Sequence, residues 1–288
     1  MSNNVRRRRS GQRHRHRTPR LTVIDLSAGS VRVVVDENGG GRILKLAVGD
    51  LDLLVTPEID DHNHGLFPMA PWAGRIRYGK FSFAGDDYQL PCNKAPHAIH
   101  GTVRDQSWKI DSSSLTHLEI STDLVEPWPF GGKVMQRFEL EPDSLSLTME
   151  VHASDRPMPV SCGWHPWWHR TPQSDDSVEL ELHAERMYHR DGEGIPSGEL
   201  VPIAPPPWDD CFTKLGEPAA VLRWPELGSL TIESDCECIV VYTEPDLALC
   251  VEPQSDPPDS FNLNARVVNP GSPLVINAKF HWAINTAI

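Results

Sequence analysis

The sequence predicts an all-β fold, a large antiparallel β-sandwich of two sheets, in a chain of 288 residues. Apolar and polar residues alternate with a period of two in many short runs, as they do in strands that bury one face. Turn-forming clusters separate these runs. No apolar stripe with helical spacing continues over three or four turns, and the 26 prolines would interrupt one. A parallel α/β sheet is disfavoured because strands do not alternate with helices.

The clearest strand covers residues 144–151, where every second residue is apolar, beginning at Leu145. Glycine-rich turns such as 38–41 and 191–194 bound several of the runs. The proline-rich segment 202–207 is predicted to be a loop that leads into a site, because strand patterns continue on both sides of it. In chain order the predicted strands are 21–26, 31–36, 42–48, 108–110, 118–121, 134–140, 144–151, 178–182, 230–233, 239–243 and 274–282.

The net charge of −13 conceals an uneven distribution of charge. Eight of the 27 lysines and arginines lie in residues 1–20, which contain no acidic residue, and this leaves 19 basic residues against all 40 acidic ones. An acidic surface repels nucleic acid and anionic membranes. We therefore expect no nucleic-acid partner and no membrane partner, and neutral substrates fit better than phosphorylated ones.

Residues 1–20 form an arginine-rich leader without apolar periodicity, which is expected to be disordered. A solvated tail is favoured over a nucleic-acid or membrane-binding arm. The leader lacks the apolar stretch of a secretory signal, and no run of 18 apolar residues predicts a membrane span. These features predict a cytoplasmic protein with one folded β-sandwich domain over residues 21–288. Its oligomeric state is left open.

Three residues suited to proton transfer, His100, His165 and Glu252, lie far apart in the chain beside strand-like residues and turn formers. Glu252 follows an apolar run, where a carboxylate without a partner or a function is costly to bury. Tryptophans flank these positions, and the flat face of an indole can support the C–H side of a sugar ring. Of these tryptophans, Trp164 and Trp167 are predicted to bind substrate, and the others are predicted to pack.

Short motifs around these residues occur in a fixed order along the chain. Together they resemble the aldose 1-epimerase (galactose mutarotase) family, and their order makes the resemblance specific although each motif alone is weak. The resemblance covers residues 21–288 and leaves out only the leader. The motifs are Pro71-Trp72-Ala73-Gly74-Arg75, Ala98-Ile99-His100-Gly101, Gly163-Trp164-His165-Pro166-Trp167, Trp208-Asp209-Asp210-Cys211-Phe212 and Val251-Glu252-Pro253-Gln254.

The resemblance implies a galactose mutarotase-like supersandwich that interconverts the α and β anomers of a free hexose such as glucose or galactose. By position, Glu252 would be the base for the anomeric hydroxyl and His165 the acid for the ring oxygen. His100 would steady the charge that develops at the ring. Arg75 and Asp209 would bind sugar hydroxyls.

Two further points concern sugar binding. Members of the family often carry Asn before the arginine, whereas Gly74 stands there in this chain, so any hydroxyl contact from that side chain is lost. On extended backbone only one of two adjacent aspartates points into a cleft, so Asp209 is assigned to the site and Asp210 to the surface.

The residue types also suit the chemistry by themselves. Ring opening removes one proton and adds another, so a carboxylate and an imidazolium on either side of the C1–O5 unit are well matched. We expect Glu252 to be ionised and His165 to be charged, since each favours the charged form of the other at close range. No metal and no organic cofactor is expected.

Each assignment has a structural alternative. His165 could be a core histidine that satisfies a carbonyl, His100 could cap a turn, and Arg75 could be an ordinary surface arginine. A metal site is disfavoured because His165 and His169 would stand roughly 13 Å apart on a strand.

Other functions remain open beside the mutarotase. A glycosidase would pair Glu252 with Asp209 and leave both histidines idle, and a serine hydrolase lacks its G-x-S-x-G elbow. The stronger alternatives are a catalytically silent sugar-binding or sugar-sensing sandwich and a hexose-6-phosphate mutarotase. The latter would need extra basic residues around the pocket.

Overall fold

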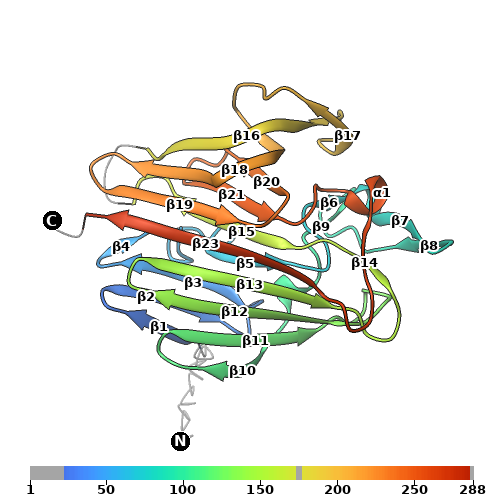
Figure 1. Ribbon diagram of the computed structural model, residues 1–288, viewed down its shortest axis with the longest axis horizontal. Coiled ribbons are helices and arrows are strands. Elements are labelled where there is room, and N and C mark those ends of the chain that lie inside the picture. Colours follow the sequence, from blue (N-terminus) through green and yellow to red (C-terminus); the bar gives the residue numbers. More distant parts are fainter. Residues whose placement is uncertain (1–22, 173–176, 286–288) are drawn as a thin grey trace, which may run out of the picture.

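The computed structural model describes residues 23–172 and 177–285, and its ribbon is almost entirely strand (Figure 1). The predicted all-β fold, a large antiparallel β-sandwich, is confirmed. The arginine-rich leader, residues 1–20, lies outside the described residues, and the single domain over 21–288 stays a prediction. Within the described part, no helix has both the length and the apolar character needed to cross a membrane.

Seventeen strands belong to one continuous network of pairings, and six shorter strands form three separate pairs. The first half of the chain contributes β1 (Ile24–Ala28), β2 (Val31–Asp36), β3 (Arg42–Val48), β4 (Leu51–Asp52), β5 (Leu66–Met69), β6 (Arg75–Ile76), β7 (Lys80–Phe83), β8 (Asp86–Gln89), β9 (Ala98–Ile99), β10 (Lys109–Ser113), β11 (His117–Asp123), β12 (Lys133–Glu141) and β13 (Ser144–His152). The second half contributes β14 (Met158–Val160), β15 (Gly163–His169), β16 (Glu179–Arg190), β17 (Pro196–Val201), β18 (Asp209–Trp224), β19 (Gly228–Ser234), β20 (Cys238–Tyr242), β21 (Ala248–Gln254), β22 (Arg266–Val268) and β23 (Leu274–Ile284).

Two antiparallel runs of strands make up the network. One run passes from β10 through β11, β12 and β13 to β23 and β19. The other passes from β1 through β2, β3, β5 and β15 to β21 and β20. β18 joins the two runs, since its first residues pair with β20 and its last residues pair with β19. The short helical elements are η1 (Arg77–Gly79), η2 (Val103–Asp105) and α1 (Ser260–Leu263).

Alternation along the strands explains how the sandwich closes. In β12, the apolar residues Val134, Phe138 and Leu140 are buried, whereas their neighbours remain partly exposed. The partner strand β13 buries Leu145 and Leu147 in the same way, so both strands turn an apolar face inward. The resulting core is one large cluster that includes several fully enclosed tryptophans.

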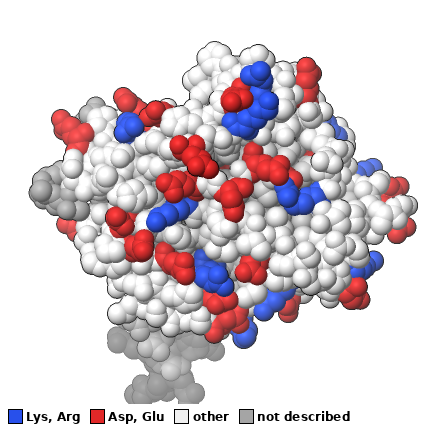
Figure 2. Space-filling model, in the orientation of Figure 1, with Lys and Arg blue, Asp and Glu red and all other residues white. Residues whose placement is uncertain are grey.

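The outer surface carries the acidic excess that the sequence shows. Acidic side chains are spread over the face seen in Figure 2, with basic ones between them. Segment 202–207, predicted as a loop, lies between β17 and β18 and leads directly into Trp208 and Asp209.

Candidate active site

Two neighbouring strands bring the predicted acid–base pair together. The register of β15 and β21 pairs Gly163 with Gln254 and Trp167 with Cys250, and this sets His165 opposite Glu252. The Nε2 atom of His165 lies 3.2 Å from Oε1 of Glu252. The side chains are buried, with exposed fractions of 7% and 3%. Residues 87 positions apart in the chain are thus in direct contact.

Aromatic rings hold His165 in place. Its imidazole is stacked between Phe67, at a centroid distance of 4.6 Å, and Trp167, at 4.9 Å. The ring of His100 meets His165 edge-on at 5.1 Å. This packing fixes the plane of the imidazole, so Nε2 is directed at the Glu252 carboxyl.

A cavity of about 320 Å³ opens above this pair. Its volume is at the lower end of the range of roughly 300–1,000 Å³ found for small-molecule sites. Six of the predicted site residues line it together, from five separate segments of the chain: Arg75, His100, His165, Trp167, Asp209 and Glu252.

The predicted charge state of the pair is contradicted. Burial, helped by the nearby guanidiniums of Arg104 and Arg42, lowers the pKa of His165 to about 3. Burial also raises the pKa of Glu252 well above its ordinary value, with a smaller contribution from Asp209. Both shifts oppose the charged forms, so desolvation favours a neutral resting pair over a carboxylate beside an imidazolium.

His100 is neutral as well. Burial lowers its pKa well below the ordinary value, and the positive charges of Arg104 and Arg75 act in the same direction. Its Nδ1 atom is buried without a hydrogen-bond partner in the described part of the protein. A neutral imidazole at the cavity wall can donate to a sugar oxygen without bringing a charge.

A cluster of alternating charge forms one side of the cavity. The Asp209 carboxylate lies 3.6 Å from Arg75 and 3.4 Å from Arg190. The Arg190 guanidinium also lies 2.8 Å from Asp210. Asp210 is buried and lines the cavity, so its predicted surface position is wrong. Fixed donors and acceptors of this kind suit the hydroxyls of a sugar.

Trp164 does not reach the cavity. Its side chain is fully buried in the core, and its indole N–H donates to Gln136 at 3.1 Å. Successive side chains of a strand point to opposite faces, so the strand that directs His165 and Trp167 to the cavity directs Trp164 and Trp168 into the core. The predicted substrate contact of Trp164 is therefore corrected to a packing role.

Gly74 has a backbone angle φ of +66°, in the left-handed region that favours glycine. A Cβ atom at this position would lie 2.6 Å from the ring of Pro258. Pro258 thus leaves no room for a side chain at position 74, including the asparagine that often precedes the arginine.

One group of buried side chains has the composition of a metal site. Ligand atoms of His165, Cys250 and Glu252 lie within 4.8 Å of one another. Burial raises the pKa of the Cys250 thiol well above its ordinary value, so the thiolate that a metal would need is disfavoured. His165 and His169 share the strand β15, and His169 does not line the cavity.

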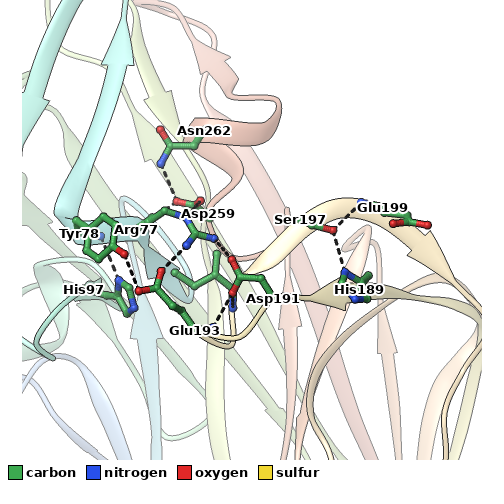
Figure 3. Close-up of polar contacts among 11 residues, drawn as sticks. Arg77, Tyr78, His97, His189, Asp191, Glu193, Ser197, Glu199, Asp259 and Asn262 are labelled. Atoms are coloured by element: carbon green, nitrogen blue, oxygen red, sulfur yellow. Dashed lines mark hydrogen bonds and ion pairs between the residues drawn. The ribbon is translucent and has the colours of Figure 1, made fainter.

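Arg77 forms ion pairs with a turn at the rim of the cavity (Figure 3). Its guanidinium binds Asp191 and Glu193 in the turn between β16 and β17, the latter at 2.5 Å. The Tyr78 hydroxyl also donates to Glu193, at 2.6 Å. Gly194 in the same turn lines the cavity. Arg77 therefore acts as a positioning residue for one wall of the site.

For the aldose substrate that the sequence resemblance predicts, replacing Arg77 with Ala is expected to raise KM by about fivefold and to change kcat less. A partly exposed ion pair contributes about 1 kcal/mol, which corresponds to roughly that factor in affinity. Steady-state kinetics on the variant would separate the two constants. Arg32→Ala, which removes the exposed pair with Asp25 at the β1–β2 edge, is the control. A fall in kcat with unchanged KM would contradict a positioning role.

Several cavity residues were not predicted: Arg42, Phe67, Arg104, Arg190, Tyr242 and Gln254. Gln254 was visible in its motif, because it stands two residues after Glu252 on the same face of β21. Its amide donates to Oε2 of Glu252 at 3.2 Å. The others lie outside the recognised motifs.

These features define a β-sandwich protein with a buried histidine–glutamate pair at the floor of a small-molecule cavity. The sequence pattern of aldose 1-epimerases matches residues 22–280, and the chain belongs to the aldose 1-epimerase family.

Individual relatives are distant. The protein YphB of Escherichia coli is 28% identical over 163 residues, which are 54% of this chain and 54% of YphB. The galactose mutarotase of Homo sapiens is 29% identical over 139 residues, 46% of this chain and 40% of that protein. The chain thus spans about half the length of these curated relatives. YihR of Escherichia coli is 24% identical over 265 residues, 83% of this chain and 85% of YihR.

Solved structures share the fold over nearly the whole chain. A galactose mutarotase-like protein from Clostridium acetobutylicum superposes with a TM-score of 0.81 at 17% identity, covering 91% of this chain and 95% of that one. The galactose 1-epimerase of Lactobacillus acidophilus superposes with a TM-score of 0.77 at 16% identity, covering 91% and 94%. At this level of identity the likeness establishes the galactose mutarotase-like fold.

Proposed function

We propose that the protein is an aldose 1-epimerase, an isomerase that interconverts the α and β anomers of a hexose, with glucose and galactose as reference substrates. The contact of 3.2 Å between His165 and Glu252 at the floor of the cavity carries the proposal. An acid and a base that meet at one point can serve two oxygens on the same ring carbon. The cytoplasmic location stays a prediction.

In the proposed reaction, Glu252 takes the proton of the anomeric hydroxyl while His165 protonates the ring oxygen. The C1–O5 bond breaks, and the open chain carries a free aldehyde. Rotation about C1–C2 presents the other face of the aldehyde, and the reverse proton transfers close the ring. Neither residue is consumed, and the reaction draws on no oxidant or co-substrate.

The remaining residues bind and orient the sugar. His100 donates to the ring region as a neutral imidazole, which limits charge build-up there. Arg75 and Asp209 hold sugar hydroxyls, and the indole of Trp167 lines the cavity beside His165. Positioning of this kind converts a slow reaction in solution into one between fixed neighbours.

A catalytically silent sugar binder is the second candidate. The low pKa of His165 favours it, since a neutral imidazole can orient a ligand without donating a proton. The two candidates predict the same binding residues and differ only in turnover.

Polarimetry of freshly dissolved α-D-glucose and α-D-galactose tests the proposal. The protein is expected to accelerate equilibration of at least one sugar well above the rate in buffer. Binding of the sugar, followed by tryptophan fluorescence, with equilibration at the rate in buffer would instead identify a silent binder.

A further inference from the structure

The cavity has a second, strongly basic side. Five basic residues line it, and two of them, Arg75 and Arg190, are paired with Asp209 and Asp210. Arg42 and Arg104 lie apart from that cluster, and both pack on the ring of Phe67. Their guanidinium carbons lie 4.9 Å and 5.0 Å from the ring centroid.

The fold brings these two arginines together through one close contact. Arg42 begins β3, and Arg104 lies in η2, far along the chain. Gly40 precedes β3 with φ of +88°, and a Cβ atom there would lie 1.9 Å from the Arg104 carbonyl oxygen. The backbone N–H of Gly40 donates to Gln106 at 3.0 Å. Glycine at this position therefore lets the turn that carries Arg104 sit against the start of β3.

The two positive charges are only partly compensated. Within residues 23–172 and 177–285, no carboxylate oxygen lies within 4.0 Å of the Arg42 guanidinium, which donates to the carbonyl of His64. Arg104 approaches a single carboxylate, the largely exposed Asp105, at 3.5 Å. The Arg104 atom in this contact is Nε, which is buried and makes no hydrogen bond in the same part of the chain.

Burial and the neighbouring charge of Arg104 act on the Arg42 guanidinium. Burial lowers the pKa of Arg42 to about 10, and the charge of Arg104 is the next cause. Two cations held close together in a cavity are costly unless an anion joins them. Guanidinium groups match carboxylate and phosphate oxygens through paired N–H donors.

We propose that the cavity takes an aldose with an anionic group, a carboxylate or a phosphate, on the exocyclic carbon attached to C5, and that Arg42 and Arg104 bind this group. The proposal rests on the proposed function, because the assignment of His165 to the ring oxygen sets the orientation of the sugar. C5 is bonded to that oxygen, and Phe67 stacks on His165 while both guanidiniums pack on Phe67. In the proposed orientation, the exocyclic carbon on C5 is therefore on the side of the sugar ring that is nearest to the arginines.

The acidic exterior does not oppose this substrate class. The negative net charge predicted neutral substrates, but the acidic residues that cause it are spread over the outer surface (Figure 2). Beside Phe67, inside the cavity, the nearest charges are the guanidiniums of Arg42 and Arg104. A cavity with low-dielectric walls focuses the field of the charges that line it. Arg75 and Asp209 would still receive the sugar hydroxyls, as for a neutral hexose.

Matched pairs of sugars test the proposal: D-galactose against D-galacturonate, and D-glucose against D-glucose 6-phosphate. Equilibration of each is measured by polarimetry, with the spontaneous rate subtracted, for the wild type, Arg42→Gln and Arg104→Gln. The control is Arg156→Gln, since Arg156 also packs on a phenylalanine, Phe130, but lies outside the cavity.

For the wild type, kcat/KM is expected to be at least about tenfold higher for one acidic sugar than for its neutral parent, as charge-assisted hydrogen bonds would give. The two variants are expected to lose most of this preference, measured as the ratio of kcat/KM for the acidic sugar to kcat/KM for its neutral parent. The ratio cancels any effect that loss of the guanidinium charge has on His165, because both sugars meet the same His165. The control keeps the preference. A preference for galacturonate over galactose would identify the anionic group as a carboxylate, and a preference for glucose 6-phosphate over glucose would identify it as a phosphate.

Equal loss on both members of a pair would overturn the proposal and assign the arginines to the packing of Phe67. A wild type that prefers the neutral sugars would overturn it as well. If no sugar is accelerated, the proposed function fails, and binding followed by tryptophan fluorescence decides the proposal separately. Tighter binding of the acidic sugar, lost in Arg104→Gln, would then support it, and equal binding of both sugars would overturn it.

Discussion

Glu252→Gln is expected to lower kcat for anomer interconversion by roughly 10²–10⁴-fold, the usual contribution of a positioned general base. The amide keeps the shape of the carboxyl but cannot accept the anomeric proton. Because burial raises the pKa of Glu252, its carboxylate is a stronger base than a free glutamate, and this strength is lost with it. Initial rates by polarimetry measure the effect.

The stability of the same variant shows whether the loss is chemical. A raised pKa means that the folded protein holds the Glu252 proton to a higher pH than the unfolded chain does. Stability from this group is therefore lost as pH rises from its ordinary pKa towards the raised one. Glutamine lacks this dependence, so thermal unfolding should favour the variant over the wild type more at pH 8 than at pH 5. A variant that is inactive and also less stable at pH 8 would contradict the assignment.

His165→Gln is expected to reduce kcat by a similar factor, roughly 10²–10⁴-fold. The imidazolium is an unusually strong acid here, since the pKa of His165 is about 3, and it would give its proton to a ring oxygen readily. Glutamine is preferred to alanine because alanine would leave a void between Phe67 and Trp167. Single-turnover rates with bound sugar separate this loss from weaker binding.

His169→Gln provides the matched control, because His169 lies on the same strand but outside the cavity lining. Its rate should equal that of the wild type. Near-normal turnover by His165→Gln, in which His169 is intact, would contradict the role of His165 as the acid.

The neutral resting pair of Glu252 and His165 holds as many protons as the charged pair that the proposed reaction uses. A protonated Glu252 beside a neutral His165 holds one proton, and so does a carboxylate beside an imidazolium. The charged arrangement is the one that reacts, and its low population offsets part of the gain from the stronger acid and base. A bound sugar that hydrogen-bonds to both Glu252 and His165 would favour the charged arrangement.

Strands with strong local patterns could be predicted from the sequence. The ranges 31–36 and 42–48 agree with β2 and β3 to the residue, because β-branched alternation and the glycine turn between them act locally. β5 and β21 were not recognised as strands. Both are buried along their whole length, and a run without alternation does not reveal a strand of this kind.

Site residues could be predicted where they lie in motifs that occur in the order typical of the family. His100, His165 and Glu252 were found in this way, although the distances between them depend on strand register, which no local pattern encodes. The prediction for Trp164 was wrong although a local rule was sufficient. Side chains alternate along a strand, so a strand that directs His165 to the cavity directs Trp164 into the core. Arg42 and Arg104 gave no local signal, because an isolated arginine on a strand or a short turn is typical of a surface.

The tight fit between Gly74 and Pro258 limits how this cavity can be altered. A side chain at position 74 needs the space that the proline ring fills, and a smaller residue at 258 by itself would only leave a gap in the wall. The two positions are therefore expected to depend on each other: an asparagine becomes tolerable at 74 only after the proline has gone. A redesign of sugar preference that uses a side chain at position 74 must therefore pass through this coupled pair of substitutions.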